Sequence, residues 1–484
     1  MAVGNRSAHL GGVVGATLRK ELRQIWRDGR MRSLAAIVVA LAVAALVFGA
    51  QAAARVQDER SAAQQAVDAQ WRDQGDKNPH VAAHFGTWVF APVSAATAID
   101  PGVTAFVGQA VKVEAHRRNF ASDASARDAV GLGLAPFSVA SVLLLLVPLL
   151  VIALGYGTWA RERERGTLRQ VLSTGAPRAS LALGKALALG AATLGLLLPA
   201  AVLVVGVLWA QTGGNGGTGA RLAALGLAYA AYFAVFGGLS MWVSSLARSS
   251  QGALVILVAL WGLFCLGVPR IGAEAAAQLA PLPSRAVFAE AVGTSLEHGI
   301  DGKTPREKGV EKLTEQMLQA QGMSGMGMLV AASQVAGVEL QAEAAWEDRV
   351  FDHHAAELQR LERRQERLSG WFALASPFVA MRSLSAALCG TDRAHHVHFT
   401  TQVEAFRKTL VGMLNKAFAK KGGSAGWRYK AGKELWKKAP PFQYVQPSAV
   451  EVLAGQGQAI ACLAIWLVLA FSGALWGAFR VRVQ

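Results

Sequence analysis

Charged residues are scarce in this chain. Only 17% of its 484 residues are Asp, Glu, Lys or Arg, whereas a soluble domain has about 25%. The deficit is concentrated in six blocks without any charge, namely residues 33–54, 129–160, 186–220, 222–247, 249–269 and 452–479. About 20 apolar residues cross roughly 30 Å of hydrocarbon. Buried helices of soluble proteins rarely run so long without a charge, so the blocks indicate an integral membrane protein.

Cysteine is equally scarce, with three residues in the chain. Cys265 and Cys462 fall inside the uncharged blocks, where we expect them to pack, and Cys389 has no partner near it in the sequence. An internal disulfide framework is therefore excluded.

Sequence signals for catalysis are missing. The nearest match to a phosphate-binding loop ends at Gly184-Lys185, but the pattern needs Gly at position 179 and Ser or Thr at 186, and both are Ala. No hydrolase frame is recognisable. No charged residue lies at the centre of a block, which argues against an ion-coupled carrier. We expect no catalytic residue and no cofactor on this chain.

The blocks predict an all-α membrane protein with six transmembrane helices. The first block is longer than a signal-peptide core of about 7–15 residues, so we expect it to be retained. The predicted spans are residues 33–54, 134–157, 180–210, 221–246, 250–269 and 455–479.

Lys and Arg cluster on one predicted side of the membrane. They are abundant in residues 1–32, in the short connection after the second span, and after the sixth span. Short basic loops stay cytoplasmic, so both termini are expected inside. The long connections 55–128 and 270–451 are then external, since long loops cross largely regardless of charge.

Residues 1–32 are predicted to form a cytoplasmic amphipathic helix that lies in the membrane interface. Leu18, Leu22, Ile25 and Trp26 recur at helical spacing among basic residues. A solvated basic tail is the alternative.

The external segments are predicted to be mainly helical. We expect the first span to continue outward as a helix until Asn78-Pro79 breaks it, and residues 270–451 to form a helical domain. Within that domain, helices are predicted at 304–321, at 329–368, from Ser376-Pro377, and at 399–418.

Residues 161–174 are predicted to form a short cytoplasmic helix parallel to the membrane. Charges alternate from Arg161 to Arg165, and Leu168 and Leu172 then bury at i and i+4, while the charges can pair with a partner. The alternative is a solvated loop whose charges only set orientation.

Two histidine groups are candidate metal ligands. The stronger is His395, His396 and His398, near Asp392; the other is His353-His354. Imidazole suits Zn and Cu, but neither spacing matches a standard site. We expect a polar helix start instead of a metal site.

The chain resembles an ABC-2 type transporter permease. Its charged Glu-x-Gly-Thr-Leu coupling segment is matched by Glu162 to Leu168, followed by Leu172 and by Gly184-Lys185 entering a span. Other features resemble a bacterial subgroup with a large periplasmic insertion before the last span, namely Pro281-Leu282-Pro283-Ser284-Arg285, Ser376-Pro377, Gly390-Thr391-Asp392 with His395-His396, and Pro441-Phe442-x-Tyr444. Arg169 stands where an acidic residue often follows Thr-Leu.

The resemblance implies a permease without its own nucleotide-binding site, in the bacterial inner membrane. It implies a dimer with a second copy or a similar permease, two ABC ATPase subunits that bind ATP and Mg, and export or extraction of a substrate. Membrane lipids are a further implied partner, periplasmic proteins are a candidate one, and nucleic acid is not expected. The expected ATPase-coupling residues are Glu162, Glu164, Arg165, Gly166, Thr167, Leu168 and Leu172.

Two other functions stay open. The same ATPase could drive the external domain against envelope partners without transport, or the chain could be a sensor or scaffold without an ATPase.

Overall fold

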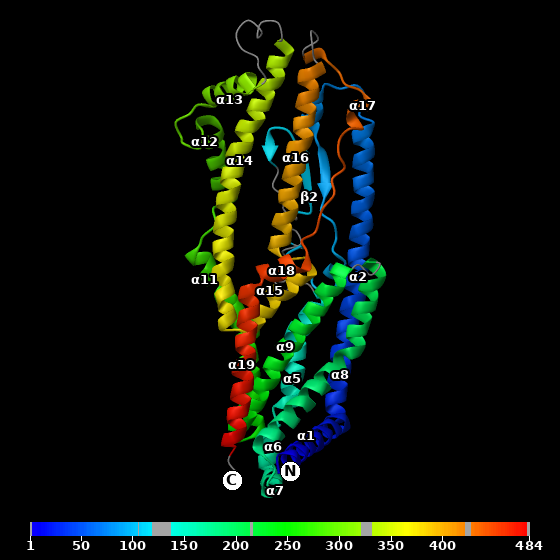
Figure 1. The fold of residues 1–484 in the computed structure, drawn as a ribbon, viewed down its shortest axis with the longest axis vertical. Helices are drawn as coiled ribbons and strands as arrows, with labels where there is room; N and C mark the ends of the chain where they lie inside the picture. The colour runs from blue at the N-terminus through cyan, green and yellow to red at the C-terminus, as the bar shows by residue number, and fades with distance from the viewer. Residues whose placement is uncertain are drawn as a thin grey trace.

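The computed structural model describes residues 2–104, 106–118, 137–212, 216–320, 332–421 and 427–481. The molecule is elongated, with a helical bundle at one end and a second layer of helices beyond it (Figure 1). Six helical runs within these residues are long and apolar enough to cross a membrane. They are α2 (Gly29–Arg72), α4 to α6 (Val139–Glu164), α8 (Arg178–Thr212), α9 (Gly216–Leu246), α10 to α11 (Ser250–Leu279) and α19 (Gly457–Arg480).

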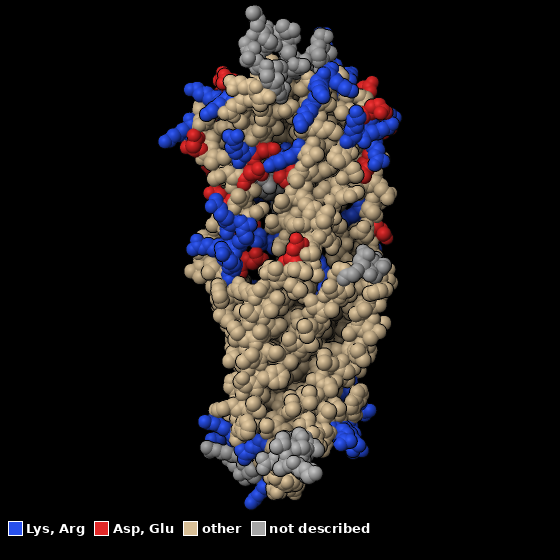
Figure 2. Space-filling view, in the orientation of Figure 1, with Lys and Arg blue, Asp and Glu red and all other residues tan. Residues whose placement is uncertain are grey.

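Each predicted span overlaps one of these runs. Figure 2 shows the surface they make: a band free of Lys, Arg, Asp and Glu, with charged side chains gathered beyond it at both ends. Large apolar side chains such as Phe48, Leu198, Leu227 and Val255 are exposed. An apolar surface of this extent is a lipid-facing surface, since water would not stabilise it.

Two spans contain a π-helical turn next to a proline. In the second, η2 (Val142–Leu146) joins α4 (Val139–Ser141) to α5 (Val147–Gly155), with Pro148 following. In the fifth, η3 (Leu263–Gly267) joins α10 (Ser250–Gly262) to α11 (Val268–Leu279), with Pro269 following. Proline has no N–H to give to the preceding turn, and in lipid the freed carbonyl needs another donor.

Cross-helix donors reach the carbonyls beside these prolines. The Tyr232 hydroxyl on α9 donates to the carbonyl oxygen of Leu144 at 2.9 Å. The Ser376 hydroxyl donates to the carbonyl oxygen of Phe264 at 2.6 Å. One carbonyl oxygen in each π-helical turn therefore accepts a hydrogen bond from a neighbouring segment of the bundle.

Helix α15 (Pro377–Cys389) lies at the end of the bundle opposite the chain termini and packs on α9 and α19. Its buried residues, including Met381, Leu384 and Leu388, belong to the same core as the spans. The predicted external domain 270–451 is therefore not separate from the membrane bundle. Residues 377–389 belong to the bundle's core.

The helices that lie beyond the bundle form the second layer. Long α14 (Ala332–Trp371) packs against α12 (Arg285–His298) and α13 (Arg306–Ala320) through Trp346, whose ring occupies the space beside Gly309. Helix α17 (Lys433–Trp436) completes this layer. Two further short helices, η5 (Phe372–Leu374) and α18 (Ala449–Gly455), join the bundle core through Ala373 and Val452.

Helix α2 continues without a break from the bundle into this layer, as predicted, and ends before Asn78 caps α3 (Pro79–Phe85). Its outer part is attached there: Trp71 Nε1 donates to the carbonyl oxygen of Trp436 at 3.3 Å, and Arg60 Nη1 donates to that of Ala91 at 2.6 Å.

A small antiparallel sheet, which the sequence did not predict, follows α3. Strand β1 (Thr87–Phe90) pairs with β2 (Ala110–Glu114), which pairs with β3 (Arg117–Arg118); the register sets Thr87 opposite Val113. The short turn η1 (Ala95–Ala98) lies between β1 and β2. The sheet buries Val89, Val111 and Val113 against α16 (Arg393–Lys421).

Candidate coupling site

Residues 161–174 form two short helices at the end of the bundle that carries both chain termini, not the single helix predicted. Helix α6 (Ala160–Glu164) and α7 (Thr167–Ser173) are separated by Gly166, whose φ of 71° lies in the left-handed region. Glycine occupies that region without a Cβ clash. The bend separates α6 from α7 at the end of the molecule where both chain termini lie (Figure 1).

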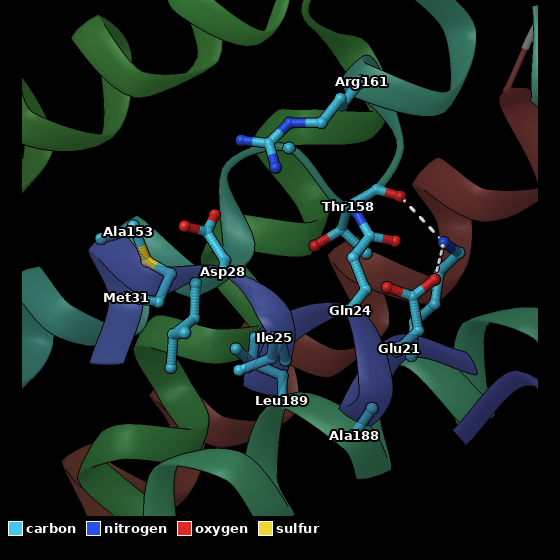
Figure 3. A pocket seen from close by; sticks show the side chains of 13 residues that line it. Glu21, Gln24, Ile25, Asp28, Met31, Ala153, Thr158, Arg161, Ala188 and Leu189 are labelled. Atoms are coloured by element: carbon cyan, nitrogen blue, oxygen red, sulfur yellow. Dashed lines mark hydrogen bonds and ion pairs between the residues drawn. The ribbon is translucent and has the colours of Figure 1, made fainter. Parts of the chain in front are cut away.

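The Glu162 side chain on α6 points into an ionic cluster instead of toward solvent. Lys185 on α8 is 2% exposed, and its Nζ lies 3.0 Å from Glu162 Oε1 and 2.8 Å from Glu21 Oε1 on α1 (Ala2–Arg27). The same Nζ donates to the carbonyl oxygen of Thr158 at 2.9 Å (Figure 3). Burying an ammonium is costly unless it is paired and hydrogen-bonded, and here it has three oxygen partners.

Lys20 completes this cluster by forming ion pairs with both Glu21 and Glu162. Burial lowers the pKa of Lys20, but its hydrogen bond to Glu162 and the charges of Glu162 and Glu21 outweigh burial and hold the pKa above its ordinary value. The charges of two lysines and two glutamates therefore balance where α1, α6 and α8 meet.

Gly184 allows α1 to reach this cluster. A Cβ added at Gly184 would lie 2.7 Å from Thr17 Cβ and 3.0 Å from the carbonyl oxygen of Val14, both on α1. Only a residue without a side chain permits that approach. The Gly184-Lys185 pair thus has a structural role: the glycine brings α1 close and the lysine pairs with it.

A cavity lies beside the cluster between α1, the second span and α8 (Figure 3). Polar Gln24, Asp28 and Arg161 share its walls with apolar Ile25 and Met31. Arg161 also donates to the Tyr156 hydroxyl at 2.5 Å.

The other charges of α6 hold the ends of two spans. Arg163 donates to the carbonyl oxygens of Ser245, at 2.7 Å, and Ala247 at the C-terminal end of α9. Glu164 accepts from Ser250 N at 2.8 Å and from its hydroxyl at 2.7 Å at the start of α10. A cation at a helix C-terminus and an anion at an N-terminus both match the helix dipole.

The backbone of α6 is also fixed to α9. Ser244 Oγ, which is buried, accepts from Trp159 N at 3.0 Å and from Ala160 N at 3.1 Å. Helix α6 is thus attached to α1, α8, α9 and α10 together.

The predicted coupling residues divide into two groups. Glu162 and Leu168 are internal, since Leu168 is 1% exposed in the bundle core, and Leu172 is half-buried against that core. Thr167 begins α7, where its hydroxyl donates to the carbonyl oxygen of Glu162 at 3.3 Å. Exposed at this end are Glu164, Arg165, Gly166, Arg169, Gln170 and Ser173.

The structure does not bring the three predicted histidines together as ligands. His395 is bonded to Asp392 through Nδ1 at 2.5 Å, and His398 lies 3.3 Å from the Tyr444 hydroxyl. His395 lies in the first turn of α16, which begins at Arg393, so the segment is the start of a helix, as expected. Among the described residues, the histidines that converge are His80, His84 and His116.

Comparison with known proteins places the chain. A family model described as ABC-2 family transporter protein matches residues 16–472. The chain belongs to the ABC-2 transporter family. No curated protein matched the sequence significantly. Membership gives this chain a permease role and makes it a multi-pass membrane protein, in agreement with its six apolar helical runs.

Sequence reasoning missed the partners of Lys185 in this ABC-2 protein. The signal was present, since Lys185 is a lone charge within the predicted third span, and a charge in a span needs a partner. The identity of the partner, Glu21, depends on how α1 crosses α8, which spacing along one chain does not give.

Proposed function

We propose that this chain is the permease subunit of an ATP-driven transporter, and that α6 and α7 receive movement from a separate ATP-binding cassette ATPase. The observation that carries the proposal is the attachment of α6 to four other helices by Glu162, Arg163, Glu164 and Ser244. A segment so attached cannot be displaced without moving the spans it holds.

The ATPase contact in this proposal is the exposed face of the two helices. Arg165, Arg169, Gln170 and Ser173 are solvent-exposed and project from the bend and α7. Arginine is enriched in protein interfaces because its planar group pairs with carboxylates in a fixed geometry. Glu162 and Leu168 act within the permease, by tying this face to α1, α8 and the core.

The assembly we propose is two permeases, identical or similar, on two ATPase subunits that bind ATP and Mg. The end that carries both chain termini belongs in the cytoplasm, below a bacterial inner membrane, with the sheet and α12, α13, α14, α16 and α17 outside. Basic Arg27, Arg161, Arg178 and Arg480 at that end support this orientation. Export, or extraction from the membrane, is the direction the family resemblance favours.

A second function has support from the same fold. Helix α2 is continuous from the bundle to the external layer, and α15 joins that layer to the bundle core. ATP-driven motion could therefore act on periplasmic partners without moving a substrate. A path between the spans that stays sealed to small solutes in every nucleotide state would favour this second function.

The contact surface is testable by charge reversal. The chain carrying Arg165→Glu and Arg169→Glu is purified from membranes of its own host, and co-purifying ATP-binding cassette subunits are quantified together with Mg-ATP hydrolysis. We expect at least a tenfold loss of both, because like charges now oppose the partner's acidic groups. The matched control is Arg480→Glu, an exposed charge reversal at the same end of the molecule.

Full ATPase recovery with the Arg165 and Arg169 reversals would refute this contact surface. A wild-type chain that purifies without any ATP-binding cassette subunit would refute ATP coupling itself. Insertion of each variant is checked by its yield and elution volume in detergent.

A further inference from the structure

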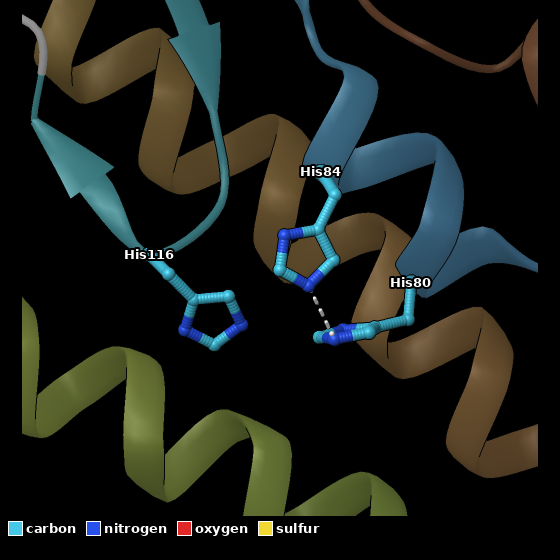
Figure 4. A group of neighbouring side chains, drawn as sticks. All are labelled: His80, His84 and His116. Atoms are coloured by element: carbon cyan, nitrogen blue, oxygen red, sulfur yellow. Dashed lines mark hydrogen bonds between the residues drawn. The ribbon is translucent and has the colours of Figure 1, made fainter.

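Three histidines converge in the external layer, far along the chain from any coupling residue. His80 and His84 occupy positions i and i+4 of α3, so they share one face, and their Nε2 atoms lie 3.0 Å apart. Asn78 caps this helix by accepting from His80 N at 2.9 Å, and Pro79 starts it. Both rings are thereby held on a short, fixed helix (Figure 4).

The third histidine comes from the turn between β2 and β3. The His116 ring stacks on that of His84 at 4.9 Å and meets that of His80 at 5.3 Å. One nitrogen from each ring lies within 4.8 Å of the others. Among the described residues, His116 is the non-glycine residue with a positive φ, 58°. A strained backbone of this kind persists only where its surroundings hold it.

The carboxylate of Glu347 orients the His116 ring by a hydrogen bond to Nδ1. Glu347 on α14 is within 2.9 Å of His116 Nδ1, so the proton sits on Nδ1 and Nε2 faces the other two rings. Arg306 donates to the other Glu347 oxygen at 3.0 Å and fixes the carboxylate. Metal-binding histidines commonly donate their second ring nitrogen to a carboxylate in this manner.

The surroundings act differently on the three rings, and those of His80 and His84 favour the neutral form. Burial, with the neighbouring His84 and His116, lowers the pKa of His80 to about 4. Burial and His116 lower the pKa of His84 as well. The hydrogen bond to Glu347 raises the pKa of His116 against the effect of burial. Three imidazoles gathered with one carboxylate behind them would repel one another if all were protonated.

We propose that His80, His84 and His116 form a site for a divalent late first-row metal ion, Zn²⁺ or Cu²⁺, with Glu347 orienting His116. Imidazole is the preferred ligand of these ions, and three histidines leave a further position for water or another donor. Zn–N bonds of about 2.0–2.1 Å bring ligand nitrogens to roughly 3.4 Å apart in a tetrahedral site. The two Nε2 atoms at 3.0 Å are about 0.4 Å closer than this spacing, and the His116 nitrogen, within 4.8 Å of them, would move inward on binding.

A bound ion would join three separate parts of the external layer. It would link α3 to the β2–β3 turn directly and to α14 through Glu347. This inference does not rest on ATP coupling, since none of the three ligands contacts the coupling site.

Metal binding is tested on the full-length chain, purified in detergent with a non-histidine tag and stripped with a chelator. Zinc chloride is titrated by calorimetry, and bound zinc is counted by mass spectrometry. We expect one tight equivalent in the wild type. His84→Ala, at an exposed position, should lose at least a hundredfold in affinity, and Glu347→Gln should lose about 10- to 100-fold. His398→Ala is the matched control and should bind as the wild type does.

Thermal unfolding separates a metal site from a merely structural cluster. Zinc should raise the unfolding temperature of the wild type in proportion to the logarithm of its concentration, and leave His84→Ala unchanged. Cobalt in place of zinc should give the visible absorption of a tetrahedral nitrogen site, lost in His116→Ala. The proposal is overturned if stripped wild-type protein binds no ion at micromolar zinc or copper, or if His84→Ala binds with unchanged affinity.

Discussion

Glu162 Oε1 on α6 lies 3.0 Å from Lys185 Nζ on α8, and this ion pair joins the inner helices directly to the third candidate span. Glu21 shares the same ammonium at 2.8 Å, so the amphipathic helix α1 is part of the junction. Three elements that sequence analysis treated separately are thus one unit at the end of this ABC-2 protein that carries both chain termini.

Removing the shared ammonium should destabilise the inner end strongly. Lys185→Ala leaves Glu21 and Glu162 facing each other without their buried partner, which costs about 3–5 kcal/mol in comparable pairs. The measurement is the unfolding midpoint in mixed detergent micelles. Lys20→Ala is the control: its side chain is 49% exposed, so we expect a loss below about 1 kcal/mol. Equal losses for both would contradict the assigned role of Lys185.

The contact between α1 and α8 should depend on Gly184. Gly184→Ala places a methyl group 2.7 Å from Thr17 Cβ, so α1 must shift, at a cost of about 1–3 kcal/mol. Gly190→Ala on the same helix meets nothing within 4 Å and should be neutral or slightly stabilising. Protease sensitivity of α1 and the unfolding midpoint distinguish the two variants. A Gly184→Ala protein as resistant as the wild type would argue against the close approach.

Tyr232 and Pro148 should be coupled energetically. Tyr232→Phe removes the donor to the carbonyl of Leu144, which lies in the turn that Pro148 leaves short of an N–H. We expect a loss of about 1 kcal/mol, typical of a hydrogen bond between membrane helices. In the Pro148→Ala background the new backbone N–H can replace that donor, so the same substitution should cost less. Strictly additive losses in the double-mutant cycle would exclude the coupling.

The proposed orientation is testable by labelling with a maleimide that does not cross membranes. All three native cysteines are buried, so the background is low. Ser173→Cys, at an exposed position on α7, should react only after permeabilisation, and Lys312→Cys, exposed on α13, should react on intact cells. The reverse pattern would invert the topology and remove the basis for cytoplasmic coupling.

The apolar bundle was predictable because its signal is local. Long uncharged runs specify membrane helices whatever their neighbours, and Asn78-Pro79 and Ser376-Pro377 mark helix starts by their own backbone chemistry. The bend at Gly166 was readable in principle, since glycine permits its positive φ, but the charge alternation suggested one continuous helix.

The parts that were missed depend on contacts between distant segments. Strand β1 has four residues, too few for a period-2 pattern to be recognised, and it is stable only through β2 and α16. His80 and His84 have the spacing of helical ligands, but His116 joins them only through the β2–β3 turn. The burial of Leu168 follows from its helical spacing with Leu172, whereas only packing shows the Glu162 side chain to be internal.

The unbroken course of α2 has a mechanical consequence. At roughly 1.5 Å per residue, its 44 residues make a rod about 66 Å long, more than twice the thickness of the hydrocarbon layer. If such a rod pivots at its foot, a tilt of about 5° carries its far tip sideways by about 6 Å. A small change in the tilt of α2 beside α1 would thus give a larger displacement at Trp71, which is hydrogen-bonded to Trp436 in the second layer.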